Sequence, residues 1–129
     1  MDSDREESET IRIRPATADD LVAVMRLFDA AVLEADAGEV AERIGDETVL
    51  VADADGRTVG ALALDGSHVD AVAVQKERRG RGIGSRLVAA AADAVDGALT
   101  ADFDEDVRPF YDALGFDIER RDGRLWGRL

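Results

Sequence analysis

The chain has 129 residues, of which 46% are apolar and 35% charged, and its formal net charge at pH 7 is −13. This length predicts one domain, which buries about two thirds of the surface that its unfolded chain exposes. The absence of cysteine excludes disulfides, thiolate zinc sites, iron–sulfur clusters and cysteine nucleophiles, and the single His68 excludes a metal site built from several histidines. The negative charge disfavours nucleic acid as a partner, because phosphate binding needs a positive surface.

Neither the apolar stretches of the chain nor its first residues point to a membrane. The longest unbroken apolar stretch, residues 87–92, is far shorter than the roughly 18 residues of a membrane span. The first residues are acidic, where a signal peptide is basic. Residues 1–9 carry no apolar side chain after the initial methionine, which predicts a disordered acidic tail before a folded domain over residues 10–129. We therefore expect a soluble, cytoplasmic protein.

The basic residues are as unusual as the net charge. Only Lys76 is a lysine, and the other fifteen positive side chains are arginines. An acidic, lysine-poor chain rich in alanine and aspartate resembles the proteins of halophilic organisms, in which a Debye length of about 3 Å at molar salt screens the repulsion between surface carboxylates. We predict that the melting temperature rises between about 0.1 M and molar salt. Thermal denaturation across that range tests this, and a flat or falling melting temperature contradicts it.

The folded part should begin with a strand and a helix. I-R-I-R-P at residues 11–15 alternates in polarity, indicating a short strand that ends at Pro15. Thr17 and Asp20 form a variant of the capping box that opens a helix. Apolar residues then recur at helical spacing, and we expect this helix to end near Gly38. The repeating residues are Leu21, Val24, Met25, Phe28, Ala31, Val32 and Ala35.

A short helix over residues 40–44 and two strands, over residues 48–52 and 58–64, come next. The strands are joined by D-A-D-G at residues 53–56, whose aspartates and glycine tolerate a positive φ. A third strand, His68–Val74, alternates with period two. Strict alternation places His68, Asp70, Val72 and Val74 on one face and the residues between them on the other.

A glycine-rich turn, Q-K-E-R-R-G-R-G-I-G-S-R, follows this strand and leads into a helix that ends at Gly97. Between Lys76 and Arg86 there are five basic residues and one acidic residue, so an acidic chain concentrates positive charge here. The first N–H groups of a helix lack helical partners, and the helix dipole adds about 0.3 to 1 kcal/mol for an anion. The alternative is a solvated basic turn that only caps the helix, and the local reversal of charge disfavours it.

The spacing of the turn limits which anion it can hold. A dinucleotide fingerprint needs a third glycine where this chain has Ser85, and the phosphate-loop motif G-x-x-x-x-G-K-[ST] is absent.

Farther on, residues 98–103 indicate a strand, and D-E-D at residues 104–106 caps another helix. The carboxyl-terminal residues fold back as a hairpin with Asp122 and Gly123 at its turn, and we expect Trp126 in the core or at an interface.

The turn closely resembles the acetyl-coenzyme A signature [QR]-x-x-G-x-[GA] of the GNAT superfamily of N-acyltransferases, through Arg79, Gly82 and Gly84. I-R-P-A-T-A-D-D-L at residues 13–21 and P-F-Y-D-A-L-G-F at residues 109–116 are similar to the family's opening and closing elements. The resemblance implies that the strand binds the pantetheine arm and that the turn's N–H groups hold the diphosphate. The residues it assigns to coenzyme binding are Val72, Val74, Arg79, Gly80, Arg81, Gly82, Ile83, Gly84, Ser85 and Asp104, the last where many relatives have asparagine.

Three side chains are candidates for catalysis. Tyr111 occupies the Y-x-x-x-G-F position from which, by resemblance, the family protonates the leaving thiolate. Periodicity alone favours an aromatic core residue over a catalytic one at Tyr111, and the resemblance to the family reverses that preference. Asp70 is the first candidate for the base that accepts the amine proton, and His68, with its ordinary pKa of about 6.5, is the second. The resemblance offers the N–H of Val74 as the oxyanion contact.

The resemblance implies an α/β fold of the α+β type, with a mixed sheet of six or seven strands flanked by about four helices. The expected function is transfer of the acetyl group of acetyl-CoA to a primary amine by direct attack in a ternary complex, without a metal. The alternative is an acyl-CoA-binding or regulatory module of the same fold that has lost turnover. The amine acceptor is a small molecule or a protein amine, a cationic one being favoured by the negative chain, and a homodimer is a family-level expectation.

Overall fold

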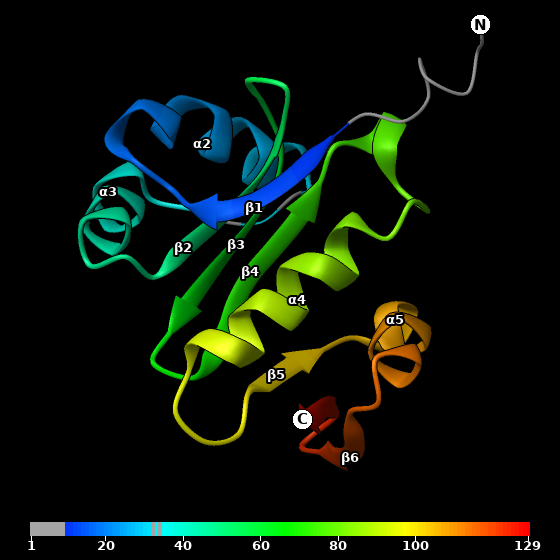
Figure 1. The fold of residues 1–129 in the computed structure, drawn as a ribbon. Coiled ribbons are helices and arrows are strands. Elements are labelled where there is room, and N and C mark those ends of the chain that lie inside the picture. Colours follow the sequence, from blue (N-terminus) through cyan, green and yellow to red (C-terminus); the bar gives the residue numbers. More distant parts are fainter. Residues whose placement is uncertain (1–9, 32, 34) are drawn as a thin grey trace, which may run out of the picture.

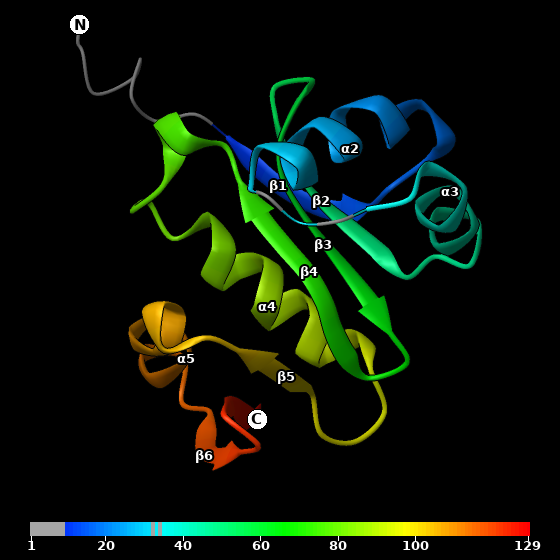
Figure 2. The ribbon, with the colours of Figure 1, turned by 180° about the vertical axis from the view of Figure 1, so that it is seen from behind.

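A computed structural model describes residues 10–31, 33 and 35–129 of the chain, so the predicted acidic tail and the predicted helical position Val32 lie outside the described residues. The elements in chain order are β1 (Ile11–Pro15), η1 (Ala18–Asp20), α2 (Leu21–Ala30), α3 (Ala37–Gly45), β2 (Val49–Ala54), β3 (Arg57–Asp65), β4 (His68–Val74), η2 (Lys76–Arg78), α4 (Ile83–Ala94), β5 (Thr100–Phe103), η3 (Glu105–Val107), α5 (Arg108–Ala113), β6 (Asp117–Arg121) and β7 (Arg124–Arg128). Figures 1 and 2 show them from opposite sides.

The strands form one seven-stranded sheet in the order β1-β2-β3-β4-β5-β7-β6. All neighbouring pairs are antiparallel except β4 and β5, which are parallel, so the sheet is mixed as predicted. Helices α2 and α3 pack on one face of the β1 to β4 region, and α4 packs on the other face (Figures 1 and 2). The predicted fold class is therefore confirmed.

Each face of the sheet has its own hydrophobic core. The larger core joins α4 to the sheet through Ile83, Leu87, Val88 and Ala91 and extends to Tyr111 on α5. The smaller core joins α2 and α3 to the opposite face. Its buried residues from the two helices are Val24, Leu27, Phe28, Val40 and Ile44. The apolar spacing in the sequence thus marks the buried face of each helix correctly.

Helix α2 is shorter than its apolar repeat predicts. It ends at Ala30 and not near Gly38, which lies instead in the first turn of α3. The reason is a new helix start at Asp36, whose extended backbone and side chain cap α3 by accepting a hydrogen bond from the N–H of Glu39 at 3.0 Å. Beyond the helix, Leu33 and Ala35 still pack against the smaller core, so their apolar character is used without helical structure.

Other predicted elements agree with the structure to within a few residues. The strand over residues 98–103 begins later, at Thr100, and the strand over residues 48–52 extends to Ala54. The hairpin turn is placed correctly, because Asp122 and Gly123 have φ of 50° and 82° between β6 and β7. Two consecutive left-handed residues are the requirement of a type I′ turn.

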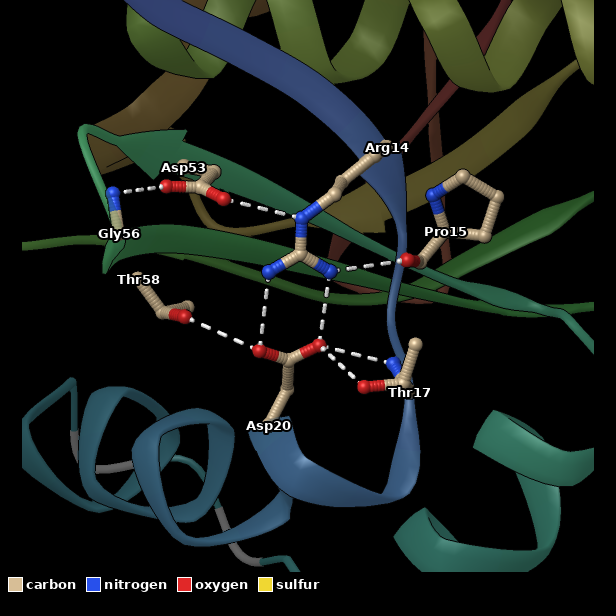
Figure 3. A network of polar contacts seen from close by, with 7 residues as sticks. All are labelled: Arg14, Pro15, Thr17, Asp20, Asp53, Gly56 and Thr58. Carbon is tan, nitrogen blue, oxygen red and sulfur yellow. Dashed lines mark hydrogen bonds and ion pairs between the residues drawn. The ribbon is translucent and has the colours of Figure 1, made fainter.

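A buried ion-pair network ties β1 to the start of α2 (Figure 3). Asp20, 7% exposed, is the one buried charged residue in the described part of the chain. Both of its carboxylate oxygens accept hydrogen bonds from Arg14, at 2.8 and 3.1 Å, while Oδ2 also accepts from the N–H of Thr17 and Oδ1 from the hydroxyl of Thr58. The Nε of Arg14 donates to Asp53 at 3.1 Å. The predicted capping box is thus present and serves this larger network.

We predict that this network makes the stability of the fold sensitive to acid. The hydrogen bonds from Arg14 lower the pKa of Asp20 from 3.8 to about 2, with help from Thr17 and against the effect of burial. A carboxyl group with a lowered native pKa stabilises the fold above its unfolded pKa and loses that contribution as the pH falls through the native pKa. We expect a loss of about 2 kcal/mol between about pH 4 and pH 2.

Urea unfolding of the wild type and Asp20→Asn between pH 2 and pH 7 measures this contribution, because the variant lacks the titrating group. At neutral pH the variant should be less stable by about 3 kcal/mol, since it removes the carboxylate that accepts two hydrogen bonds from Arg14 and leaves Asp53 as that arginine's remaining charged partner. The difference between the two proteins should shrink below about pH 4. A difference that stays constant with pH would contradict the assignment.

None of the helices in the described residues is both long enough and apolar enough to cross a membrane.

Candidate coenzyme and acyl-transfer site

The sheet opens between β4 and β5. The two strands pair only at His68 with Thr100 and at Val69 with Ala101, after which β5 pairs with β7 alone. At the same point, the register between β3 and β4 shifts, because Ala63 pairs with Ala71 but Leu64 pairs with Val69. An extra residue in one strand bends that strand and increases its twist. We attribute the separation of β4 from β5 to this bulge.

Because of the bulge, some side chains of β4 lie on the opposite face of the sheet from the one that strict alternation predicts. Val69, Val72 and Val74 pack on the α4 side, whereas Ala71 and Ala73 belong to the core beneath α2 and α3. Asp70 lies on the α3 side, because its Oδ2 accepts a hydrogen bond from Arg43 at 2.6 Å. The predictions that Asp70 shares a face with Val72 and Val74, and that Val69 shares one with Ala71 and Ala73, are therefore wrong. The extra residue breaks the period-two alternation.

The glycine turn lies where β4 ends and α4 begins. Gly80 and Gly82 have φ of 81° and 82°, in the left-handed region that favours glycine, and space is open where a Cβ would stand. Gly82 is the N-cap of α4, and among the described residues no side chain caps this helix and no acidic residue stands in its first turn. The first N–H groups of α4 are therefore available to an anion.

The other predicted residues of the turn have distinct roles. Arg79 folds back on the strand, and its Nε donates to the carbonyl oxygen of Val74 at 3.1 Å. Gly84 permits close packing, because a Cβ there would lie 3.2 Å from Cε1 of Phe110 on α5. Arg81 is exposed. Gly80 and Gly82 thus allow the backbone conformation of the turn, and the side chain of Arg79 binds the last carbonyl group of β4.

A cavity of about 890 Å³ joins the turn to the open edge of β4. Its walls include eight of the predicted coenzyme-binding residues, namely Val72, Val74, Arg79, Gly80, Gly82, Ile83, Gly84 and Ser85. Sequence reasoning missed other parts of the wall, which come from the end of α2 and from the region of α5. These residues are Ala30, Ala31, Leu33, Val107 and Phe110. The cavity is therefore apolar along the strand and carries backbone N–H groups and arginines at the turn.

Tyr111 is buried beside this cavity but is not part of its wall. Its ring stacks on Phe103 with centroids 4.1 Å apart and meets Phe110, a wall residue, edge to face at 5.0 Å. Burial, with a smaller contribution from the negative charge of Asp102, raises the pKa of the Tyr111 phenol to about 12. The phenol is therefore protonated at neutral pH, which is the state that can donate a proton.

His68 is held at the closed end of the opening between β4 and β5. Its Nδ1 lies 2.7 Å from Oγ1 of Thr100, and its Nε2 lies 2.6 Å from Oδ1 of Asp102. Its ring also packs against Trp126, with centroids 5.2 Å apart. Partial burial opposes ionisation of Asp102, but hydrogen bonds from His68 and Arg124 outweigh it and lower the pKa of that carboxyl. Both ring nitrogens of His68 therefore have partners.

The structure does not bring all the predicted site residues together. Asp70 borders a separate cavity of about 240 Å³ beside α3, and Asp104 forms an ion pair with Arg124 at 2.8 Å instead of lining the large cavity. The described residues contain no group of three or more histidine, aspartate or glutamate side chains that could hold a metal ion. The geometry thus assembles the coenzyme-binding residues more completely than the predicted bases.

A mixed sheet that opens beside a glycine turn at a helix N-terminus is typical of the GNAT fold. The profile of the acetyltransferase (GNAT) domain matches residues 15–123, so the chain belongs to the GNAT acetyltransferase family. A search of curated proteins found no match.

Solved structures share the fold at low sequence identity. A GNAT-family acetyltransferase from Bacillus cereus matches with a TM-score of 0.79 and 17% identity, covering 93% of this chain and 96% of that one. The PaiA N-acetyltransferase of Thermoplasma acidophilum, solved with coenzyme A, matches with a TM-score of 0.76 and 15% identity, covering 92% of this chain and 98% of that one. The putative acetyltransferase YncA of Salmonella typhimurium, solved with acetyl-CoA, matches at 0.74 and 19%, covering 93% of each chain. Two further matches are longer chains, of which this chain covers 34% and 35%.

Proposed function

We propose that this protein transfers the acetyl group of acetyl-CoA to a primary amine by direct attack in a ternary complex. The observation that carries the proposal is the single cavity that joins an uncapped helix N-terminus to the open edge of β4. Such a cavity suits a ligand with an anionic end and a long, less polar arm that can pair with a strand. Coenzyme A has that shape, and two structural neighbours were solved with coenzyme A or acetyl-CoA.

In the proposed complex the turn holds the diphosphate. The N–H groups of Ile83, Gly84 and Ser85 donate to it, and the absence of a Cβ at Gly80 and Gly82 lets the phosphates approach the backbone. The pantetheine arm lies along Val72 and Val74, where β4 pairs with β3 on one side and has no partner strand on the β5 side. This arrangement directs the thioester into the opening between β4 and β5, beside α5.

The chemical step needs a proton acceptor and a proton donor. The amine nitrogen attacks the thioester carbonyl carbon only when neutral, and a base takes the proton that it loses. The N–H of Val74 is proposed to stabilise the negative charge on the carbonyl oxygen. When the carbon–sulfur bond breaks, the phenol of Tyr111 donates its proton to the thiolate. The phenolate then recovers a proton from solvent.

The base is proposed to be Asp70 or His68, acting directly or through water. Asp70 is half exposed, and the ion pair with Arg43 engages its Oδ2. His68 would act only after releasing Thr100 or Asp102. The acceptor is proposed to be a cationic amine, on a small molecule or a protein, because the net charge of −13 attracts cations at low salt. A cytoplasmic, homodimeric protein remains part of this proposal.

Thiol release from acetyl-CoA across a panel of polyamines, aminoglycosides and peptide amino termini tests the proposal, at low and at molar salt. A titration with coenzyme A is run beside it. Turnover with at least one amine supports the transferase. Binding without turnover on any amine would favour the alternative, an acyl-CoA-binding module, and failure to bind at any ionic strength would refute both.

A further inference from the structure

A second cavity, of about 590 Å³, lies between α2 and the residues that follow β4. Ala23, Arg26, Leu27 and Ala30 of α2 form one wall, and Val74 to Arg79 supply most of the other. Ala30, Val74 and Arg79 also line the large cavity, so the two spaces are neighbours that share a wall. The mechanism proposed above uses nothing in the second cavity apart from these shared residues.

This second cavity is positive in a strongly negative chain. Three cationic side chains line it, Arg26, Lys76 and Arg79, against one carboxylate, Glu77. The smaller cavity beside α3 shows the reverse balance, with three carboxylates and one arginine. Two cations converge from different elements, Arg26 from α2 and Lys76 from η2, so the charge does not arise from the basic turn alone.

Two of the three cations that line this cavity, Arg26 and Lys76, have no partner among the described residues. Six arginines elsewhere form ion pairs with carboxylates, namely Arg14, Arg43, Arg108, Arg120, Arg121 and Arg124. The side chains of Arg26 and Lys76 make no hydrogen bond or ion pair with any described residue. In a chain with nearly twice as many acidic as basic residues, two cations beside a cavity that have no partner among the described residues point to an external anion.

The position of Arg79 indicates which anion. Its Nε is bound to the carbonyl oxygen of Val74, which holds the guanidinium on the wall between the two cavities. If the diphosphate of coenzyme A occupies the N-terminus of α4 in the large cavity, the nearest additional anion on the same ligand is the 3′-phosphate of its ribose. A phosphate monoester carries a charge of about −1.5 to −2 at pH 7 and is well matched by two or three cations.

We propose that the second cavity binds the 3′-phosphate of coenzyme A, with Arg26 and Lys76 as its ligands and Arg79 bridging to the diphosphate. This inference rests on the proposed function, because it requires the coenzyme to occupy the large cavity. It makes the protein selective for the 3′-phosphorylated coenzyme over dephospho-CoA, which has the same diphosphate, pantetheine arm and thiol. Selectivity arises in part from Arg26 on α2, an element outside the glycine turn.

Calorimetric titration of the full chain with coenzyme A and with dephospho-CoA, at fixed low salt, tests the proposal. The wild type should bind coenzyme A about tenfold or more tightly than dephospho-CoA. Arg26→Gln and Lys76→Gln should each weaken coenzyme A binding by about tenfold and leave dephospho-CoA binding unchanged within about twofold. Arg128→Gln is the matched control, because it removes the same charge from an exposed position on β7 and should change neither affinity.

The outcomes separate this inference from the proposed function. If the wild type binds both ligands with equal affinity, the 3′-phosphate site is wrong while coenzyme binding stands. If Arg26→Gln and Lys76→Gln weaken both ligands equally, or no more than Arg128→Gln does, their effect is general electrostatics and the site is again refuted. If the wild type binds neither ligand, the proposed function fails together with the inference. Melting temperatures of the variants verify that each one is folded.

Discussion

Replacing Gly82 with aspartate is expected to abolish detectable binding of acetyl-CoA. Gly82 is the N-cap of α4, and its backbone aims the first N–H groups of that helix at the large cavity. A carboxylate at an N-cap accepts hydrogen bonds from these N–H groups, so it would occupy the place proposed for the diphosphate. It would also repel the diphosphate as a like charge. We expect affinity to fall by about 100-fold or more, measured by calorimetric titration.

Two further variants separate charge from backbone strain. Gly82→Asn has nearly the same shape as Gly82→Asp and adopts a positive φ more readily than most residues, but it adds no charge. It should therefore bind acetyl-CoA with intermediate affinity. Gly56→Asp adds the same carboxylate at another glycine of positive φ with open space around it, in the turn between β2 and β3, and should leave binding unchanged. Affinity retained within about threefold in Gly82→Asp would place the diphosphate elsewhere.

The turn around Gly82 can be predicted from sequence because its causes are local. A glycine before a helix, basic neighbours and an apolar strand on the other side all lie within about twenty consecutive residues, and each constrains the backbone directly. The structure confirms the strand His68–Val74 and a helix that starts directly after Gly82. The cavity itself depends on distant elements, so its walls from α2 and α5 have no signal in the sequence of the turn.

The faces of β4 are not predictable in the same way. Alternation along His68–Val74 gives each side chain a face only while the ladder with β3 is regular, and the bulge opposite Ala63 and Leu64 is a property of the pair of strands. The sequence of β4 contains no glycine or proline that would indicate a bulge. As a result, the strand itself is identified correctly, while Val69 and Asp70 are assigned to the wrong faces.

The hydrogen-bond partners of the candidate polar residues also cannot be predicted from the residues next to them in the sequence. Asp70 meets Arg43 of α3, His68 meets Thr100 and Asp102 of β5, and Asp104 meets Arg124 of β7. Each pair joins residues at least 20 positions apart, brought together by the order of strands in the sheet. The fold, and not the local sequence, determines which carboxylates are engaged by arginines.

Replacing Tyr111 with phenylalanine is expected to lower the turnover number by about 10²- to 10⁴-fold with little change in the affinity for acetyl-CoA. The substitution removes only the hydroxyl, while the stacked contact with Phe103 and the edge contacts with Phe110 and Phe116 persist. Folding and coenzyme binding should therefore survive, and thiol release under saturating acetyl-CoA measures the chemical step. Equal turnover in both proteins would make Tyr111 a core aromatic residue without a role in catalysis.

The ionisation of the phenol provides an independent check, because Tyr111 is the only tyrosine in the chain. Burial raises its pKa from 10.0 to about 12, so the absorbance of the phenolate should appear only near pH 12 in the folded protein and near pH 10 in the unfolded one. An acid with this pKa stays protonated throughout an ordinary assay range. If activity is lost as the pH rises toward 10, the loss is assigned to the ionisation of another group. Tyr111→Phe should then leave the shape of the pH profile of activity unchanged and lower the activity at every pH. A profile whose alkaline limb disappears in the variant would instead show that the phenol ionises during turnover, with a pKa far below that of the buried group.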